Sequence, residues 1–256
     1  MKKPQGTQRY FIEVIYQGIA HCGWQKQPNQ NTIQDILEKT FQQIGYPTSV
    51  TGSSRTDAGV HACKQVAHLD LPHGTDIKKL QRSVNALLPS SIAVHVFKKV
   101  KPRAHARFDA IKREYEYRIA SMRHPFLYQR CYFYNHKIDI RRINKIAQSL
   151  LGEQDFSSLC KAKSDVAHHT CHVTTSHWKA SESFISFFIA SNRFLHNMVR
   201  TAVGTMLALE KDGKGAKELQ IILKKKDRAF AGPTLPPEGL FLLRVDYPPT
   251  IFQELT

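Results

Sequence analysis

The residues best suited to chemistry lie in one short segment, residues 53–62, which reads Ser-Ser-Arg-Thr-Asp-Ala-Gly-Val-His-Ala. It holds a single carboxylate, Asp57, between two runs of strand-forming residues. Thr-Asp-Ala-Gly is typical of a turn, because Asp bonds its own backbone and Gly accepts a positive φ. Arg55 stands two residues before Asp57, where a guanidinium would keep the carboxylate ionised, as a nucleophile or general base requires. The alternative, which the composition alone favours, is an Asx-turn on a surface loop.

The charge of the whole chain indicates an anionic partner. The 256 residues include 37 Lys and Arg against 21 Asp and Glu, a net charge of +16. Such an excess favours nucleic acid. We find no basic amphipathic helix with an aromatic face, no run long enough to span a bilayer and no apolar signal segment, so we expect no membrane association. The five cysteines are scattered and lack CxxC pairs, which predicts reduced thiols in the cytoplasm.

The first half of the chain alternates strand and helix patterns. Residues 9–16 predict a strand, and Asn31 with Gln34 predicts a capping box that opens a helix ending at Gly45. Strands at 49–53 and 64–71 then flank the Asp57 segment. A second helix from Ile77 ends before Pro89, and a strand follows at 92–98. The order is β-α-β-β-α-β, the ferredoxin-like arrangement.

The second half repeats this order with one added helix. Strands are expected at 112–120, 172–179, 184–190 and 240–247, and helices at 139–152, 195–209 and 216–224. We therefore expect the α+β fold class, with two tandem ferredoxin-like domains whose sheets could abut and leave a cleft between them. The basic stretch 98–107 contains Pro102 and is the expected boundary, giving domains 1–104, with the Asp57 loop, and 105–256.

Several other residues have both a functional and a structural interpretation. Trp24 is most simply a core anchor, and placing RNA is the alternative. Tyr115 lies on an alternating strand, where a core position is usual. Residues 168–172 read His-His-Thr-Cys-His, but a strand would divide these ligands between two faces, so we predict no metal site. The basic cluster either contacts phosphates or forms a solvated face; it comprises Lys98, Lys99, Lys101, Arg103, Arg107, Lys112 and Arg113.

The run Arg-Thr-Asp-Ala-Gly-Val-His-Ala at 55–62 resembles the signature loop of the bacterial tRNA pseudouridine synthase A family. Further segments of the chain resemble other parts of this family, namely residues 105–110, 113–117, 194–200, 231–234 and 237–242. The resemblance implies that Asp57 is the catalytic residue, that Tyr115 contacts the target uridine and that Arg200 faces the catalytic Asp. Two positions depart from the family pattern: Ser54 stands where Gly is usual, and Cys171 stands where many relatives carry Arg.

The resemblance further implies the reaction. The family, a group of homodimers, converts uridine to pseudouridine at positions 38, 39 and 40 of tRNA, in the anticodon stem-loop. Breaking C1′–N1 and joining C1′ to C5 is an isomerisation, so we expect no cofactor. Asp57 can act at C1′, at the uracil ring or on a ribose proton. Arg200 and Arg55 would hold it ionised, and Tyr115 would stack on the extracted base.

Two other classes of function stay open at this point. Ferredoxin-like sheets with exposed aromatic rings also form RNA-binding modules without chemistry. A hydrolase of the N-glycosidic bond would need a positioned water, commonly with a second carboxylate, and the Asp57 loop has no second acidic residue. The nucleosides of treated tRNA distinguish the three classes.

Overall fold

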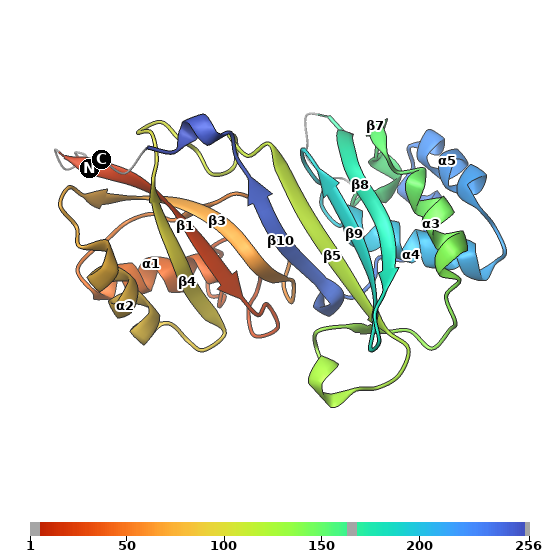
Figure 1. Cartoon of the computed structure of the whole chain (residues 1–256), viewed down its shortest axis with the longest axis horizontal. Helices are drawn as coiled ribbons and strands as arrows, with labels where there is room; N and C mark the ends of the chain where they lie inside the picture. Colours follow the sequence, from red (N-terminus) through yellow and green to blue (C-terminus); the bar gives the residue numbers. More distant parts are fainter. Residues whose placement is uncertain (1–5, 163–167, 254–256) are drawn as a thin grey trace. The chain divides into compact units, whose positions relative to one another are not determined.

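A computed structural model describes residues 6–162 and 168–253, and the chain divides into two compact units (Figure 1). The first unit comprises residues 1–111 and 242–256, and the second comprises residues 112–241. The predicted ranges 1–104 and 105–256 differ from this division, because the chain returns to its first unit at the end. Backbone hydrogen bonds hold the returning segment: Lys101 N donates to Ile251 O at 3.0 Å, and Ile111 N to Asp246 O at 2.9 Å.

The first unit has the predicted β-α-β-β-α-β order. Its elements are β1 (Thr7–Tyr16), α1 (Ile33–Gln43), β2 (Thr51–Gly52), β3 (His61–Pro72), α2 (Ile77–Leu87) and β4 (Ile92–Lys99). Strand β1 pairs antiparallel with both β3 and β4, β2 extends along β3, and the returning strand β10 (Leu240–Asp246) also borders β3. Helices α1 and α2 lie together beside this sheet (Figure 1).

Helix α1 begins one residue later than its predicted cap. Thr32, not Asn31, is the N-cap, and its hydroxyl accepts from Asp35 N at 3.4 Å. The Asn31 amide instead donates to Ala20 O at 3.0 Å and ties down the preceding loop. Both residue types cap helices well, so the sequence did not decide between neighbours. The helix turns an apolar face to the core of the unit, where Ile33, Leu37 and Phe41 are fully buried.

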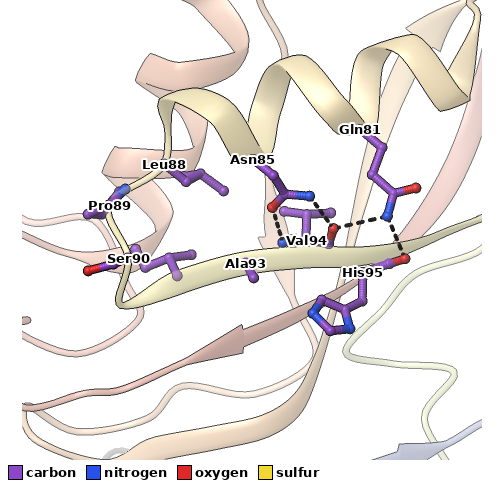
Figure 2. Close-up of a pocket in the computed structure, with 9 residues that line it drawn as sticks. Gln81, Asn85, Leu88, Pro89, Ser90, Ala93, Val94 and His95 are labelled. Carbon is purple, nitrogen blue, oxygen red and sulfur yellow. Dashed lines mark hydrogen bonds between the residues drawn. The ribbon is translucent and has the colours of Figure 1, made fainter.

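The outer edge of β4 is covered by side chains of α2 (Figure 2). The Asn85 amide bonds both backbone groups of Val94, donating to its oxygen and accepting from its nitrogen at 2.8 Å each. Gln81 donates to His95 O at 2.7 Å, where the β1–β4 register shifts. These residues line a hollow of about 460 Å³ between α2 and β4. Since its amides are engaged with the strand, we interpret the hollow as part of the edge protection.

The second unit is also α+β. Its elements are β5 (Lys112–Ala120), β6 (Tyr132–Phe133), α3 (Ile140–Gln148), β7 (Gly152–Asp155), β8 (Thr170–Ala180), β9 (Ile185–Ser191), α4 (Met198–Lys211) and α5 (Ala216–Lys225). The strand order is β5-β9-β8-β7, with β6 paired to β5. Strands β6 and β7 were not predicted, because two and four residues carry little periodicity.

Two ends of helices in this unit show how the sequence sets them. The Asp139 carboxylate accepts from Arg141 N and Arg142 N, so Asp139 is the predicted N-cap of α3. Helix α4 begins at Met198 rather than at residue 195, because Asn197 before it has a left-handed backbone with φ 66°.

In the described part of the chain, no helix has the length and apolar character needed to cross a membrane.

Candidate active site

The Asp57 loop connects β2 to β3 in the first unit. Val60 N donates to Asp57 O at 3.2 Å, which closes the predicted turn, and Gly59 within it has a φ of 81°. This left-handed backbone explains the glycine. Asp57 is half-buried, whereas Arg55 is exposed to solvent. The loop therefore presents one partly accessible carboxylate from a defined turn.

Thr56, the neighbour of Asp57, anchors this loop to the core of the first unit. Its hydroxyl bonds the Tyr16 hydroxyl at 2.8 Å, and its carbonyl accepts from Trp24 N at 3.0 Å. Gly23 packs so closely that a β-carbon there would lie 2.5 Å from Thr56 O. A side chain at position 23 would thus displace the backbone that carries Asp57.

Trp24 packs against the residues that hold the same loop. Its indole is buried and packs 6.0 Å from the Tyr16 ring, and a β-carbon at Gly52 would fall 2.5 Å from it. The interpretation of Trp24 as a core anchor is therefore confirmed. Tyr16 and Gly23 are positioning residues that the sequence analysis did not single out. A glycine directly before the Trp was the available signal for the close approach.

The first turn of the loop is fixed by a buried amide. Gln65 on β3 accepts from the Ser53 hydroxyl at 2.5 Å and donates to Ser54 O at 2.9 Å. The φ of Ser54 is not positive. The serine, which stands where the family usually has glycine, therefore introduces no left-handed strain. A buried glutamine on a strand is unusual, and that polarity was the signal that could have identified Gln65.

Residues 104–109 form a second ordered loop in the first unit. Arg9 makes a bidentate ion pair with Asp70, at 2.8 Å for each contact, and donates to Ala104 O at 3.0 Å. The His68 imidazole accepts from Ala106 N at 3.1 Å and lies 4.6 Å from the His105 ring. Burial, followed by the charges of Arg9 and His105, lowers the pKa of His68 to about 4. His68 is therefore a neutral acceptor that holds the loop near neutral pH.

Tyr115 lies on β5 in the second unit, opposite Ile189 of β9. Only 6% of the residue is exposed, and its ring meets Phe194 edge-on with centroids 5.0 Å apart. Its neighbour Tyr117 is fully buried and donates to Pro236 O at 2.8 Å. The predicted alternation of β5 thus places Tyr115 among packed aromatic residues.

Arg200 lies in the first turn of α4 in the same unit. Its Nε donates to Leu235 O at 2.6 Å, and Leu235 N returns a bond to Arg200 O at 3.3 Å. One terminal nitrogen approaches the Asn197 side chain at 3.4 Å. These bonds orient the guanidinium and join the start of α4 to the segment before β10.

The four predicted site residues are divided between the units. Asp57 and Arg55 belong to the first unit, and Tyr115 and Arg200 belong to the second. In residues 6–162 and 168–253, no group of three His, Cys, Asp or Glu side chains is arranged to hold a metal ion. Cys171, the position that departs from the family pattern, is buried, and this burial raises the pKa of its thiol to about 11.

Comparison with known proteins assigns the family. A sequence model described as tRNA pseudouridine synthase matches residues 14–109 and 146–248, which is more than half of the chain. The chain belongs to the tRNA pseudouridine synthase family, whose members are isomerases.

Individual relatives agree over almost the full length. Proteins named tRNA pseudouridine synthase A from Bacteroides thetaiotaomicron and Bacteroides fragilis are 38% and 39% identical, over 97% and 96% of this chain and 94% and 99% of theirs. The namesake from Chlamydia trachomatis serovar A is 36% identical over 95% of this chain and 93% of its own.

Proposed function

We propose that this protein isomerises uridine to pseudouridine at positions 38, 39 and 40 of the tRNA anticodon stem-loop, with Asp57 as its catalytic carboxylate. The observation that carries the proposal is the pinned Asp57 turn, held through Thr56 by Tyr16 and Trp24. The family match and the relatives' names support tRNA as the substrate. The net charge of +16 suits a polyanion.

The reaction requires one carboxylate and balances within the nucleotide. The C1′–N1 bond breaks, the uracil turns, C1′ joins C5, and the proton on C5 leaves as N1 gains one. No atom or electron is exchanged with a second substrate, so the proposal includes no cofactor. Asp57 assists bond cleavage at C1′, at the ring or at a ribose proton, three routes that the reaction's balance does not distinguish.

The other predicted residues would bind the substrate. Tyr115 would stack on the extracted uracil, which offsets part of the cost of removing a base from its stack. Arg200 and Arg55 would hold charge near the reacting group and keep Asp57 ionised. The hydrogen bonds of Arg200 to Leu235 and Asn197 support a fixed guanidinium suited to this role.

Replacing Asp57 tests the proposal directly. Asp57→Asn keeps the size and turn preference of the side chain but removes its charge. We expect pseudouridine formation in tRNA to fall by about 10²–10⁴-fold or more, the usual contribution of a positioned acid or base, while tRNA binding persists. The measurement is nucleoside analysis of tRNA after incubation.

The exposed carboxylate Asp212 provides the matched control. Asp212 ends α4, and Asp212→Asn should retain wild-type turnover. Near-normal product from Asp57→Asn would remove Asp57 from the site. With the wild-type protein, unchanged uridine would favour a binding module, and released uracil with an abasic site would favour a hydrolase.

A further inference from the structure

The segment that joins β5 to α3 exposes large apolar side chains. We call residues 121–137 the aromatic loop; it projects past the end of β5 as the yellow-green segment of Figure 1. Phe126 is 83% exposed, Tyr128 74% and Met122 68%, and Phe133 is also exposed. Clustered exposed apolar side chains mark interaction sites. The family model leaves residues 110–145 unmatched, so the family match itself assigns no role to this loop.

The aromatic loop is an ordered structure that holds its rings in place. A helical turn, Pro125–Leu127, is closed by Leu127 N to His124 O at 2.9 Å and continued by Arg130 N to Leu127 O at 3.0 Å. At its base, β6 pairs with β5, and Tyr134 N donates to Ala120 O at 3.0 Å. Because these bonds fix the backbone, little ordering cost opposes the binding of a ligand.

The charge of the aromatic loop has one sign. Residues 121–137 contain Arg123, Arg130 and Lys137, together with two histidines, and no Asp or Glu. Exposed rings beside guanidinium groups match the chemistry of unpaired nucleotides, because bases stack on aromatic faces while Arg contacts the flanking phosphates. In the sequence, Phe126 follows Arg123 by three residues and Tyr128 precedes Arg130 by two.

Charge also argues against the main alternatives. A second copy of this chain, docked loop to loop in a symmetric pair, would bring like charges together on a protein of net charge +16. An anionic lipid surface would attract the cations. However, Phe126 and Tyr128 lie in and directly after a turn of three residues, Pro125–Leu127, and not on the long amphipathic helix that lies in a membrane interface. An RNA partner uses both the rings and the charges.

We propose that the aromatic loop is a binding site for unpaired bases of RNA, with Phe126 and Tyr128 as stacking surfaces and Arg123 and Arg130 as phosphate contacts. We assign this loop a role in binding RNA and no chemical step. The proposal rests on the proposed function only in taking tRNA as the natural RNA.

The test measures how tightly each protein variant binds an unmodified tRNA transcript. All variants also carry Asp57→Asn, so that turnover does not change the RNA. Replacing Phe126 and Tyr128 together with Ala should raise Kd about tenfold or more, and with Leu by nearly as much, because Leu is apolar but has no aromatic face. Phe126→Tyr with Tyr128→Phe should retain the affinity. Replacing Arg123 and Arg130 with Gln should make the slope of log K against log salt shallower by about 1.4–1.8.

Helix α5 of the same unit supplies matched controls. Ile221, Lys217 and Lys224 are exposed there, and replacing Ile221 with Ala or the two lysines with Gln should change the affinity far less. The proposal is overturned if the Ala pair binds tRNA like the wild type. It is also overturned if the variant with Ala at Phe126 and Tyr128 keeps its tRNA affinity but no longer self-associates in sedimentation. The same holds if that variant keeps its tRNA affinity but no longer binds phosphatidylglycerol vesicles.

Nucleoside analysis separates this proposal from the proposed function. If wild-type protein forms pseudouridine while the Ala pair binds tRNA normally, the aromatic loop is not an RNA site and the function stands. If the wild type leaves uridine unchanged while the Ala pair loses tRNA affinity, the function fails and the loop assignment stands.

Discussion

At the residue scale, Tyr115 is the substrate-binding candidate for which substitutions distinguish most clearly between the possible roles of the side chain. Tyr115→Phe keeps the aromatic face and loses the hydroxyl, whereas Tyr115→Leu loses the face. If the ring stacks on the base, Phe should keep much of the single-turnover rate, and Leu should lose about 1–3 kcal/mol of binding. If the hydroxyl transfers a proton, Phe should be nearly as slow as Leu.

The packing of Tyr115 against Phe194 makes a melting temperature the necessary companion measurement. A purely structural tyrosine predicts that activity falls only as stability falls. If the rates of the Phe, Leu and Ala variants follow their melting temperatures, Tyr115 should be removed from the site.

We expect His68 to make the stability of the fold depend on pH. Burial lowers its pKa to about 4 in the folded chain, against about 6.5 when unfolded. Between these values the unfolded state binds a proton that the folded state does not, so stability is lost as the pH falls from 6.5 toward 4. His68→Gln keeps an acceptor for Ala106 N but does not titrate, and its free energy of unfolding should vary less with pH. Urea titrations at pH 4–7 measure this, and parallel curves for both proteins would contradict it.

The sequence identified individual residues unevenly. The turn around Asp57 was predicted from its composition and is present, whereas the catalytic role of Asp57 was implied by the family resemblance of residues 55–62. Tyr16, Gly23 and Gln65, which hold that turn, were missed because their contacts join residues far apart in the chain, such as Tyr16 and Thr56, which are 40 positions apart. The roles of Asp57, Tyr115, Arg55 and Arg200 stay predictions.

At the element scale, the edge of β4 depends on two amides of α2. Asn85→Ala removes both bonds to Val94, and we expect a loss of about 1–2 kcal/mol in the free energy of unfolding. The uncovered edge should also increase aggregation, since an exposed strand edge pairs with other chains. Urea unfolding and light scattering measure the two effects.

Arg82→Ala on the same helix is the control for this prediction, because Arg82 is exposed and the substitution should change stability by about 0.5 kcal/mol or less. Equal losses in both variants would mean that helix propensity, not edge protection, accounts for the effect of Asn85.

Element types were predictable and their ends less so. Strand β5 was predicted with its observed limits, because nine residues of alternation leave one register that buries Tyr117 and Ile119. Helix α4 was predicted to start at residue 195, since its apolar pattern continues through a turn that the left-handed Asn197 interrupts. Periodicity records which face is buried, whereas a helix begins where a backbone angle changes.

At the scale of the whole molecule, the charge of +16 should dominate RNA affinity. The logarithm of the tRNA association constant should fall linearly and steeply with the logarithm of salt concentration. Replacing Lys99 and Lys101 with Ala should weaken the binding of all tRNAs about equally. It should also make the slope of log K against log salt shallower by about 0.7–0.9 for each phosphate that is no longer neutralised. Filter binding at several salt concentrations measures this.

Lys39→Ala is the matched control, because this lysine of α1 is already paired with Asp35 at 2.6 Å. Its slope should stay near the wild-type value. A nearly salt-independent affinity of the wild-type protein would contradict an electrostatic mode of binding.

The return of residues 242–256 to the first unit also sets an order of assembly during synthesis. Tyr247 donates to Ala106 O at 2.6 Å across 141 positions, and its ring lies 4.8 Å from Phe11. The ribosome completes residues 112–241 before it delivers this segment. The second unit can therefore fold while the first, with the Asp57 loop, still lacks a strand. Contacts so distant in sequence slow folding, so a nascent chain stalled before residue 242 carries the Asp57 loop on an unfinished sheet.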